Sequence, residues 1–191
     1  GYQEVLTPKM NMTWFEAGAG LHFAVVYEGL AWISLGVSIN GVMAPDDQSL
    51  PKSNCVLCLP ANLNATGQFQ INGWTASSFE AMPSDLTGNI TCSQNKTHTM
   101  LTFSRAFDNG IADHAQIHAN GLATPIIFAA GVANAFDKQP LKSEMSYKNI
   151  TFRPPAPAVH HVSIIAQAEQ KRKEEEEEKK KEVKKKIKSK K

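Results

Sequence analysis

Short runs of hydrophobic residues recur along the first 152 residues, with turn-forming residues between them. Several runs alternate hydrophobic and polar residues with a period of two, which is typical of strands that bury one face. The alternating runs are 10–14, 68–74, 97–105 and 145–152. The run 125–132 is apolar on both faces and predicts a central strand. The runs 20–27 and 31–38, split by Glu28-Gly29, predict a hairpin, and 55–59 predicts a short strand.

These elements predict an all-β protein, an antiparallel Ig-like β-sandwich, because no helical pattern of useful length precedes residue 160. Two Asn-x-Thr sequons agree with the phase of the strands: Asn11 and Asn149 would face water while their neighbours face the core. The side chains expected to be buried share this inward phase or lie in the central strands. They are Trp14, Trp32, Leu101, Phe103, Ile127 and Phe152.

The chain has 191 residues, of which 42% are hydrophobic, so one core is expected. We predict three parts: a sandwich over 1–153, a Pro/Ala-rich linker over 154–162, and a Lys/Glu-rich tail over 163–191. The tail contains strong helix formers and no Gly or Pro, and it is expected to be a solvated helix or a disordered segment. The other interpretation is a segment that contacts an acidic surface.

Charge is distributed unevenly between these parts. Residues 1–168 hold 8 Lys/Arg and 11 Asp/Glu, whereas residues 169–191 hold 12 Lys/Arg and 7 Asp/Glu. A mildly acidic sandwich argues against nucleic acid as the partner of the globular domain. We expect other extracellular proteins or glycans as partners, and no stretch of the sequence resembles a transmembrane segment.

Sequons and cysteines indicate the secretory pathway. Five Asn-x-Thr sequons, more than chance predicts, make the chain a candidate glycoprotein that is secreted or exposed on the extracellular face of a membrane. A disulfide is expected between Cys92 and either Cys55 or Cys58, in preference to a zinc or redox site. The chain has neither a signal peptide nor an initiator Met, and we interpret it as a processed or truncated product. The sequons begin at Asn11, Asn64, Asn89, Asn95 and Asn149.

Three motifs in a fixed order resemble the DOMON family, which includes the N-terminal module of dopamine β-hydroxylase and the cytochrome of cellobiose dehydrogenase. The first comprises Met12-Thr13-Trp14, Trp32–Ser38 and Gly41-Val42-Met43. The second comprises Asp85-Leu86 and Leu101–Phe107, and the third is Pro125–Gly131. Together they cover residues 5–152, and the resemblance implies a β-sandwich that carries a ligand.

Some members of that family hold a b-type haem between a Met and a His. Met43 matches the position of the family's Met, so the resemblance makes it a candidate axial ligand. The expected His is missing, because no His occurs between residues 119 and 159. The corresponding segment contains Lys142, which could ligate iron only when neutral. It also contains Met145, which could be a second thioether but is expected to face the core. We therefore expect no cofactor, and haem b is the alternative.

Other residue patterns give no support for catalysis. His114 and His118 are spaced four apart, but no third metal ligand accompanies them. Asp46 and Asp47 are neighbours that would point apart on an extended chain. Trp74 is the tryptophan expected to be exposed. The sequence predicts a non-catalytic extracellular glycoprotein module with a structural, adhesive, sugar-binding or small-ligand-binding function. The alternative is a b-type haem-binding electron-transfer domain with Met43 as one axial ligand.

Overall fold

A computed structural model describes residues 1–43, 51–73, 75–82, 87–108, 114–118, 121–136 and 140–152. Internal contacts divide the chain into a unit of Gly1–Pro154 and a second unit of Pro155–Lys191. The predicted linker and charged tail lie outside the described residues, as do Asp46, Asp47 and Trp74.

Strands dominate the described part of the chain, and the remaining regular structure there consists of two short 3-10 turns, η1 (Leu63–Ala65) and η2 (Ala76–Ser78). The strands are β1 (Tyr2–Thr7), β2 (Met10–Ala17), β3 (Gly20–Glu28), β4 (Ile33–Val37), β5 (Asn54–Cys58), β6 (Gly67–Ile71), β7 (Phe79–Ala81), β8 (Thr87–Gln94), β9 (His98–Ala106), β10 (Ala123–Gly131) and β11 (Pro140–Thr151).

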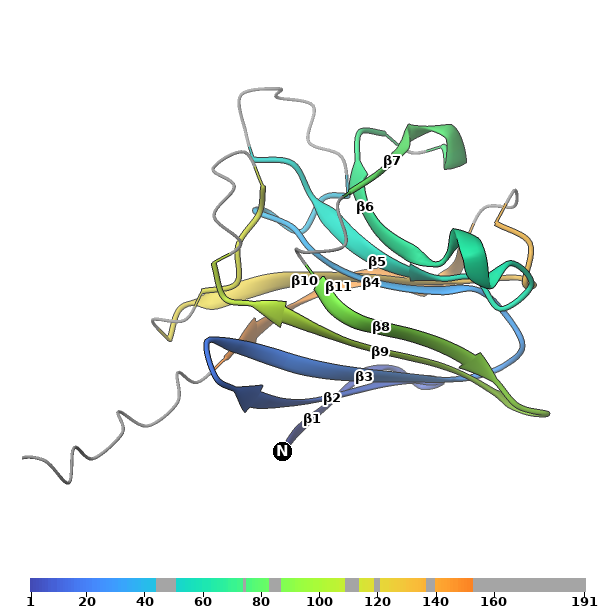
Figure 1. Ribbon diagram of the computed structural model, residues 1–191, viewed down its shortest axis with the longest axis horizontal. Helices are drawn as coiled ribbons and strands as arrows, with labels where there is room; N and C mark the ends of the chain where they lie inside the picture. The colour runs from blue at the N-terminus through green and yellow to red at the C-terminus, as the bar shows by residue number, and fades with distance from the viewer. Residues whose placement is uncertain are drawn as a thin grey trace, which may run out of the picture. The chain divides into compact units, whose positions relative to one another are not determined.

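These strands form two stacked antiparallel sheets, which confirms the predicted all-β sandwich (Figure 1). One sheet has five strands in the order β1-β2-β3-β9-β8. The other has six in the order β11-β10-β4-β5-β6-β7. In Figure 1, β6 and β7 rise from the six-stranded sheet on the side away from the five-stranded one. This curl lets a second apolar layer form outside the sandwich.

The main core lies between the sheets, and the alternation of the sequence produces it. On β2, β3 and β9 every second side chain is buried, as a strand with one wet face requires. Phe23 lies at the centre, with ring centroids 5.0 Å from Phe103 and 5.8 Å from Phe152. All six residues predicted to be buried are buried. Two of them, Trp32 and Ile127, belong to clusters outside the main core.

The predicted hairpin at Glu28-Gly29 is wrong. β3 and β4 belong to different sheets, and β4 pairs with β5 and β10 instead. The buried hydroxyl of Thr99 on β9 lies 3.0 Å from the carbonyl oxygens of both Gly29 and Ala31. These contacts stabilise the segment that carries the chain from one sheet to the other.

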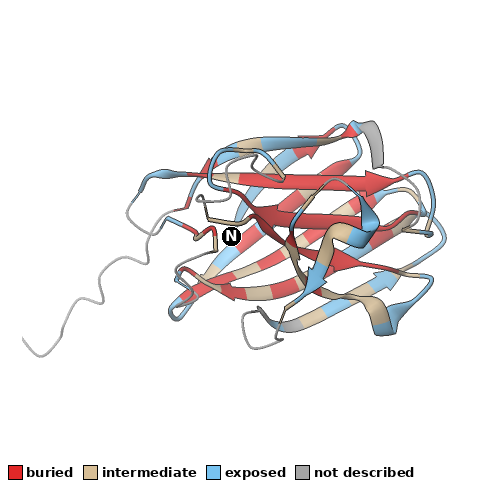
Figure 2. Ribbon diagram, turned by 90° about the horizontal axis from the view of Figure 1, so that it is seen from above, coloured by how far each residue is buried: buried red, intermediate tan, exposed pale blue. Residues whose placement is uncertain are grey.

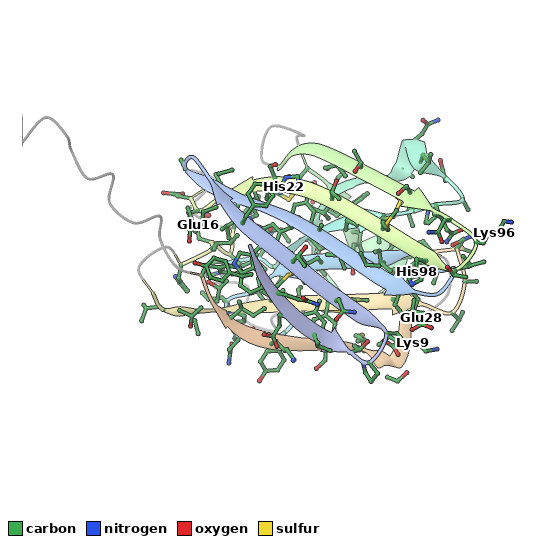
Figure 3. The ribbon with its side chains drawn as sticks, turned by 90° about the horizontal axis from the view of Figure 1, so that it is seen from below. Lys9, Glu16, His22, Glu28, Lys96 and His98 are labelled. Carbon is green, nitrogen blue, oxygen red and sulfur yellow. A yellow bond between two sulfur atoms is a disulfide. The ribbon has the colours of Figure 1, made fainter. Side chains whose placement is uncertain are left out.

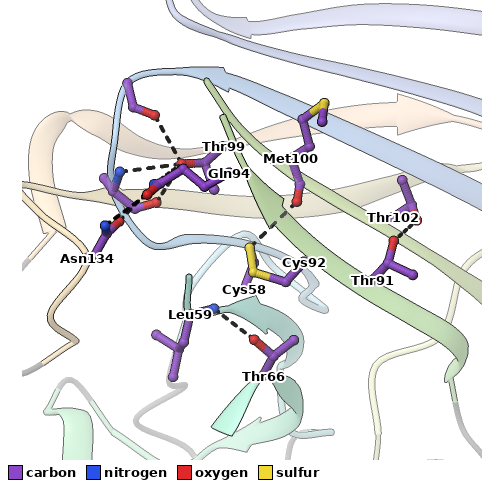
Figure 4. Close-up of a disulfide and its surroundings, with 12 residues drawn as sticks. Cys58, Leu59, Thr66, Thr91, Cys92, Gln94, Thr99, Met100, Thr102 and Asn134 are labelled. Carbon is purple, nitrogen blue, oxygen red and sulfur yellow. Dashed lines mark hydrogen bonds between the residues drawn. A yellow bond between two sulfur atoms is a disulfide. The ribbon is translucent and has the colours of Figure 1, made fainter. Parts of the chain in front are cut away.

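A disulfide joins the sheets (Figure 4). It links Cys58 on β5 to Cys92 on β8, with a Cα–Cα distance of 5.2 Å. Cys55 remains a buried free thiol. The predicted pairing of Cys92 with one member of the C-x-x-C is confirmed, and the structure selects the member that points into the main core.

Candidate functional site

The six-stranded sheet is apolar on both of its faces. Side chains of β4, β5 and β10 that point toward the five-stranded sheet join the main core, and the intervening ones form two further buried clusters on the opposite face. We call this second apolar surface the outer patch. Figure 2 looks onto this side and shows buried strands in the middle of the sheet. Its buried members are Trp32, Leu57, Leu59, Ala129, Cys55, Ile71 and Ile127.

Small side chains form the middle of the outer patch. Strand register aligns Ala129 with Ser34, and Ile127 with Gly36 and then Cys55, across three adjacent strands. Ser34, Cys55 and Ala129 are all buried. A Cβ at Gly36 would overlap the backbone of β5, so this position accepts only glycine. The patch therefore has a flat floor with larger side chains around it.

Aromatic rings cover this floor. The ring centroids of Trp32 and Phe136 lie 5.0 Å apart, and those of Phe136 and Phe79 lie 5.2 Å apart. Phe69 on β6 continues the series, 6.4 Å from Phe79. Because Phe69, Phe79 and Phe136 are only partly buried, solvent reaches the cover but not the floor.

The indole of Trp32 contributes a buried polar group to the patch. Trp32 is 3% exposed, and its Nε1 has no hydrogen-bond partner among the described residues. A buried N–H group without an acceptor lowers stability by about 1–3 kcal/mol, so a ligand that accepts a hydrogen bond from it would recover this free energy. The ring lies across Gly131, where any Cβ would overlap the indole nitrogen. Trp32 is buried as predicted, but on the outer face of the sheet and not in the core between the sheets.

Two methionines reach the outer patch from different segments. Met43, the candidate axial ligand, packs against the cluster of Cys55, Ile71 and Ile127. Met145 on β11 packs against the cluster that contains Trp32 and Ala129. The prediction that Met145 faces inward is therefore wrong, because the register pairs it with the outward-facing Ala129. The side chain of Lys142 lies outside the described residues.

The histidines of β3 and of residues 114–118 lie elsewhere. His22 on β3 hydrogen-bonds Ser104 on the five-stranded sheet, with 3.0 Å between Nδ1 and Oγ. His114 contacts Gln70 through its Nε2 at 3.1 Å, and His118 is exposed. None of these histidines is on β4, β5, β10 or β11. In the described parts of the chain, no three His, Cys, Asp or Glu side chains gather as a metal site would require.

Beneath the patch, Cys55 and Arg105 perturb each other. Burial raises the pKa of the Cys55 thiol to about 12, and the nearby guanidinium of Arg105 opposes this only partly. Burial likewise lowers the pKa of Arg105 to about 10. The guanidinium donates to Asn54 Oδ1 and, at 2.7 Å, to the carbonyl oxygen of Ala115. A thiol that remains protonated is a poor nucleophile, so Cys55 functions as a small apolar group.

A small cavity adjoins Arg105 in the main core. Its volume is about 10 Å³, which accommodates one water at most. This space is too small for an organic ligand. The lining residues are Phe23, Leu35, Gly36, Val37, Phe103, Arg105 and Ile126.

The sequons lie on the surface wherever their side chains are described. Asn64, Asn95 and Asn149 are exposed, and Asn11 on β2 is partly exposed. Asn89 is on β8, and its side chain lies outside the described residues. No helix within the described residues combines the length and the apolar character that a membrane crossing needs.

Comparison with known proteins supplies no relative: no protein-family model and no curated protein matches the chain. The candidate site consequently depends on geometry alone. Sequence reasoning identified Met43 but missed Phe69, Phe79, Phe136 and Ala129. The available signal was the uninterrupted apolar run around Ile127, which indicates a strand buried on both faces.

Proposed function

We propose that this protein is a non-catalytic, glycosylated module of the secretory pathway that binds a flat apolar small ligand on the outer patch. One observation carries the proposal: the sheet has a second buried apolar face with a floor of small side chains beneath partly exposed aromatic rings. Ligand sites in proteins are mostly apolar and contain a few placed polar groups. The unpartnered indole N–H of Trp32 is such a group.

A fold-level resemblance to DOMON domains is part of the same proposal. The order of the sequence motifs supports it, and so does the packing of Met43 against the patch. The five sequons and the Cys58–Cys92 disulfide support passage through the secretory pathway, where oxidising conditions maintain disulfides. Contact of the charged tail with an acidic surface remains a separate proposal.

Binding can be tested with a neutral fluorescent probe, N-phenyl-1-naphthylamine, on protein from a secretory eukaryotic host. We expect Ala129→Phe to abolish saturable binding, because a ring at this buried position fills the floor beside Trp32. Ala123→Phe is the matched control, since Ala123 is exposed on the same strand. Equal binding by both variants and the wild type would remove the outer patch as the site.

The second candidate function is electron transfer by a b-type haem. Two thioethers on one apolar surface, Met43 and Met145, favour it. Met43 and Met145 are the side chains that would hold the iron through their thioether sulfurs, and haem would supply one-electron redox chemistry when bound. The chain itself would exclude water from the iron with Trp32, Phe79 and Phe136.

An absorption spectrum of the natively purified protein tests this alternative. Sharp reduced α and β bands that disappear in Met43→Ala would establish it. If Met145→Ala has the same effect, the pair of thioethers is the ligand set. A featureless visible spectrum, both before and after haemin addition, would leave the apolar-ligand proposal alone.

A further inference from the structure

The outer face of the five-stranded sheet contains an apolar row with a sequon in it. We call the row the β3 row. Its members are aligned across five strands by the register of the ladders, and they point away from the six-stranded sheet. Val5 is 52% exposed and Met100 is 36% exposed, which is high for side chains this apolar. The row is Val5, Asn11, Val26, Met100 and Ser93.

Among the side chains that the structure describes, none in the middle of this face is charged. The adjacent row holds Gln3, Thr13, Ala24, Thr102 and Thr91, and the two threonines at its end hydrogen-bond each other at 2.5 Å. In Figure 3, which views this face, the labelled titratable residues gather at the two ends of the strands. Glu16 and His22 are at one end, whereas Lys9, Glu28 and His98 are at the other. The uncharged middle lacks the lysines and glutamates that usually make an exposed sheet surface hydrophilic.

The sequon spans both rows. Asn11 lies in the apolar row and Thr13 lies in the hydroxyl-rich one, because residues two apart on a strand share a face. Neighbouring strands are about 4.8 Å apart, so Val26 is about one strand spacing from Asn11 and Met100 about two. A saccharide attached to Asn11 therefore begins beside the two apolar side chains.

We propose that the N-linked glycan of Asn11 lies along β3 and β9 and covers Val26 and Met100. The inference rests on the proposed secretory location. In the transfer, the Asn11 amide nitrogen loses a proton and bonds to C1 of the first N-acetylglucosamine, while the bond from C1 to the diphosphate oxygen breaks and the lipid diphosphate leaves with that electron pair. Pyranose rings present C–H faces and an acetyl methyl to the apolar row, while their hydroxyls reach Thr102 and Thr91. The glycan thereby solubilises the uncharged middle of this sheet face.

Oxidation of Met100 by tert-butyl hydroperoxide tests this contact, because sulfoxide formation depends on access to the sulfur. The full chain is made in a glycosylating host as wild type, Asn11→Gln and Asn64→Gln. We expect Met100 to oxidise several-fold faster in Asn11→Gln than in the other two proteins. Asn64 is exposed on η1, outside the five-stranded sheet, so its variant controls for the loss of one glycan.

Met10 and Met12 are internal controls, because both are 0% exposed and should remain unoxidised while the protein is folded. Rates are compared at dilutions where sedimentation velocity shows every variant to be monomeric. Equal Met100 rates in all three proteins, with Asn11 glycosylated, would overturn the inference. An unmodified Asn11 beside a glycosylated Asn64 would also overturn it and leave the secretory proposal intact. If no sequon is modified, the secretory proposal itself fails.

Discussion

Removal of the Cys58–Cys92 disulfide should lower the stability of the sandwich substantially. The bond joins residues separated by 34 positions and connects β5 of one sheet to β8 of the other. In the chain-entropy model, a crosslink that closes a loop of this length lowers the conformational entropy of the unfolded chain. This raises the free energy of the unfolded state by about 4 kcal/mol at 25 °C. Replacement of both cysteines by alanine should therefore destabilise the fold by about 4 kcal/mol.

The expected fall in melting temperature follows from the size of the domain. For a domain of 150–250 residues, 1 kcal/mol corresponds to about 2–4 °C, so the fall should be about 8–16 °C. Thermal unfolding followed by circular dichroism measures it in the double variant Cys58→Ala/Cys92→Ala. Wild-type protein under reducing conditions should fall by a similar amount, because the same bond is broken without a change in side chain.

Cys55→Ala is the matched control. The Cys55 thiol is buried on the opposite face of the six-stranded sheet from Cys58 and is not part of a disulfide. Its loss should therefore leave the Cys58–Cys92 bond intact. Peptide mapping should recover that bond in both the control and the wild type. A fall of less than about 3 °C in the double variant would show that the disulfide constrains the unfolded chain far less than its loop length implies.

Four further predictions concern Cys55, Arg105, Lys148 and Gly131. Alkylation of Cys55 by iodoacetamide at pH 8 should be about a thousandfold slower than in denatured protein, because its pKa rises from 9.0 to about 12. The raised pKa also means that stability from the neutral thiol is complete below pH 9 and is lost as pH rises toward 12, which urea titrations would detect. Arg105→Met should cost about 3 kcal/mol in urea unfolding, since Asn54 and Ala115 lose their donor. Lys148→Met, which removes the half-exposed pair with Glu4, should cost under about 1 kcal/mol. Gly131→Ala should destabilise the fold by about 2 kcal/mol and shift the fluorescence emission of Trp32, because the new Cβ would overlap the indole. Gly88→Ala, with open space around it, should do neither. Equal melting temperatures for the two variants would contradict the contact between Trp32 and Gly131.

Local pattern was sufficient to predict the strands and their phase. Alternation along 10–14 and 97–105 predicted which side chains face the core, because a strand turns successive side chains to opposite faces. The same argument oriented Asn11 and Asn149 toward solvent, where the structure has them exposed or partly exposed. Burial of Ile127 also followed from the sequence, since a run apolar on both faces requires cover on both.

The pairing of the strands was decided by the tertiary structure. Glu28-Gly29 has the composition of a hairpin turn, yet β3 and β4 belong to different sheets, where β3 pairs with β2 and β9 and β4 pairs with β5 and β10. The same topology turns Cys58 toward β8 and Cys55 away from it, a choice that the C-x-x-C left open.

The outer patch likewise depends on long-range placement. The outer patch takes side chains from different segments of the chain, among them Met43, Phe79, Phe136 and Met145. No sequence motif links these segments. They meet because β6 and β7 curl over the sheet while β10 and β11 pair beside β4. A linear pattern specifies which face of its own strand a residue occupies, whereas a site assembled from several strands also needs their order, and that order is set by packing across the whole domain.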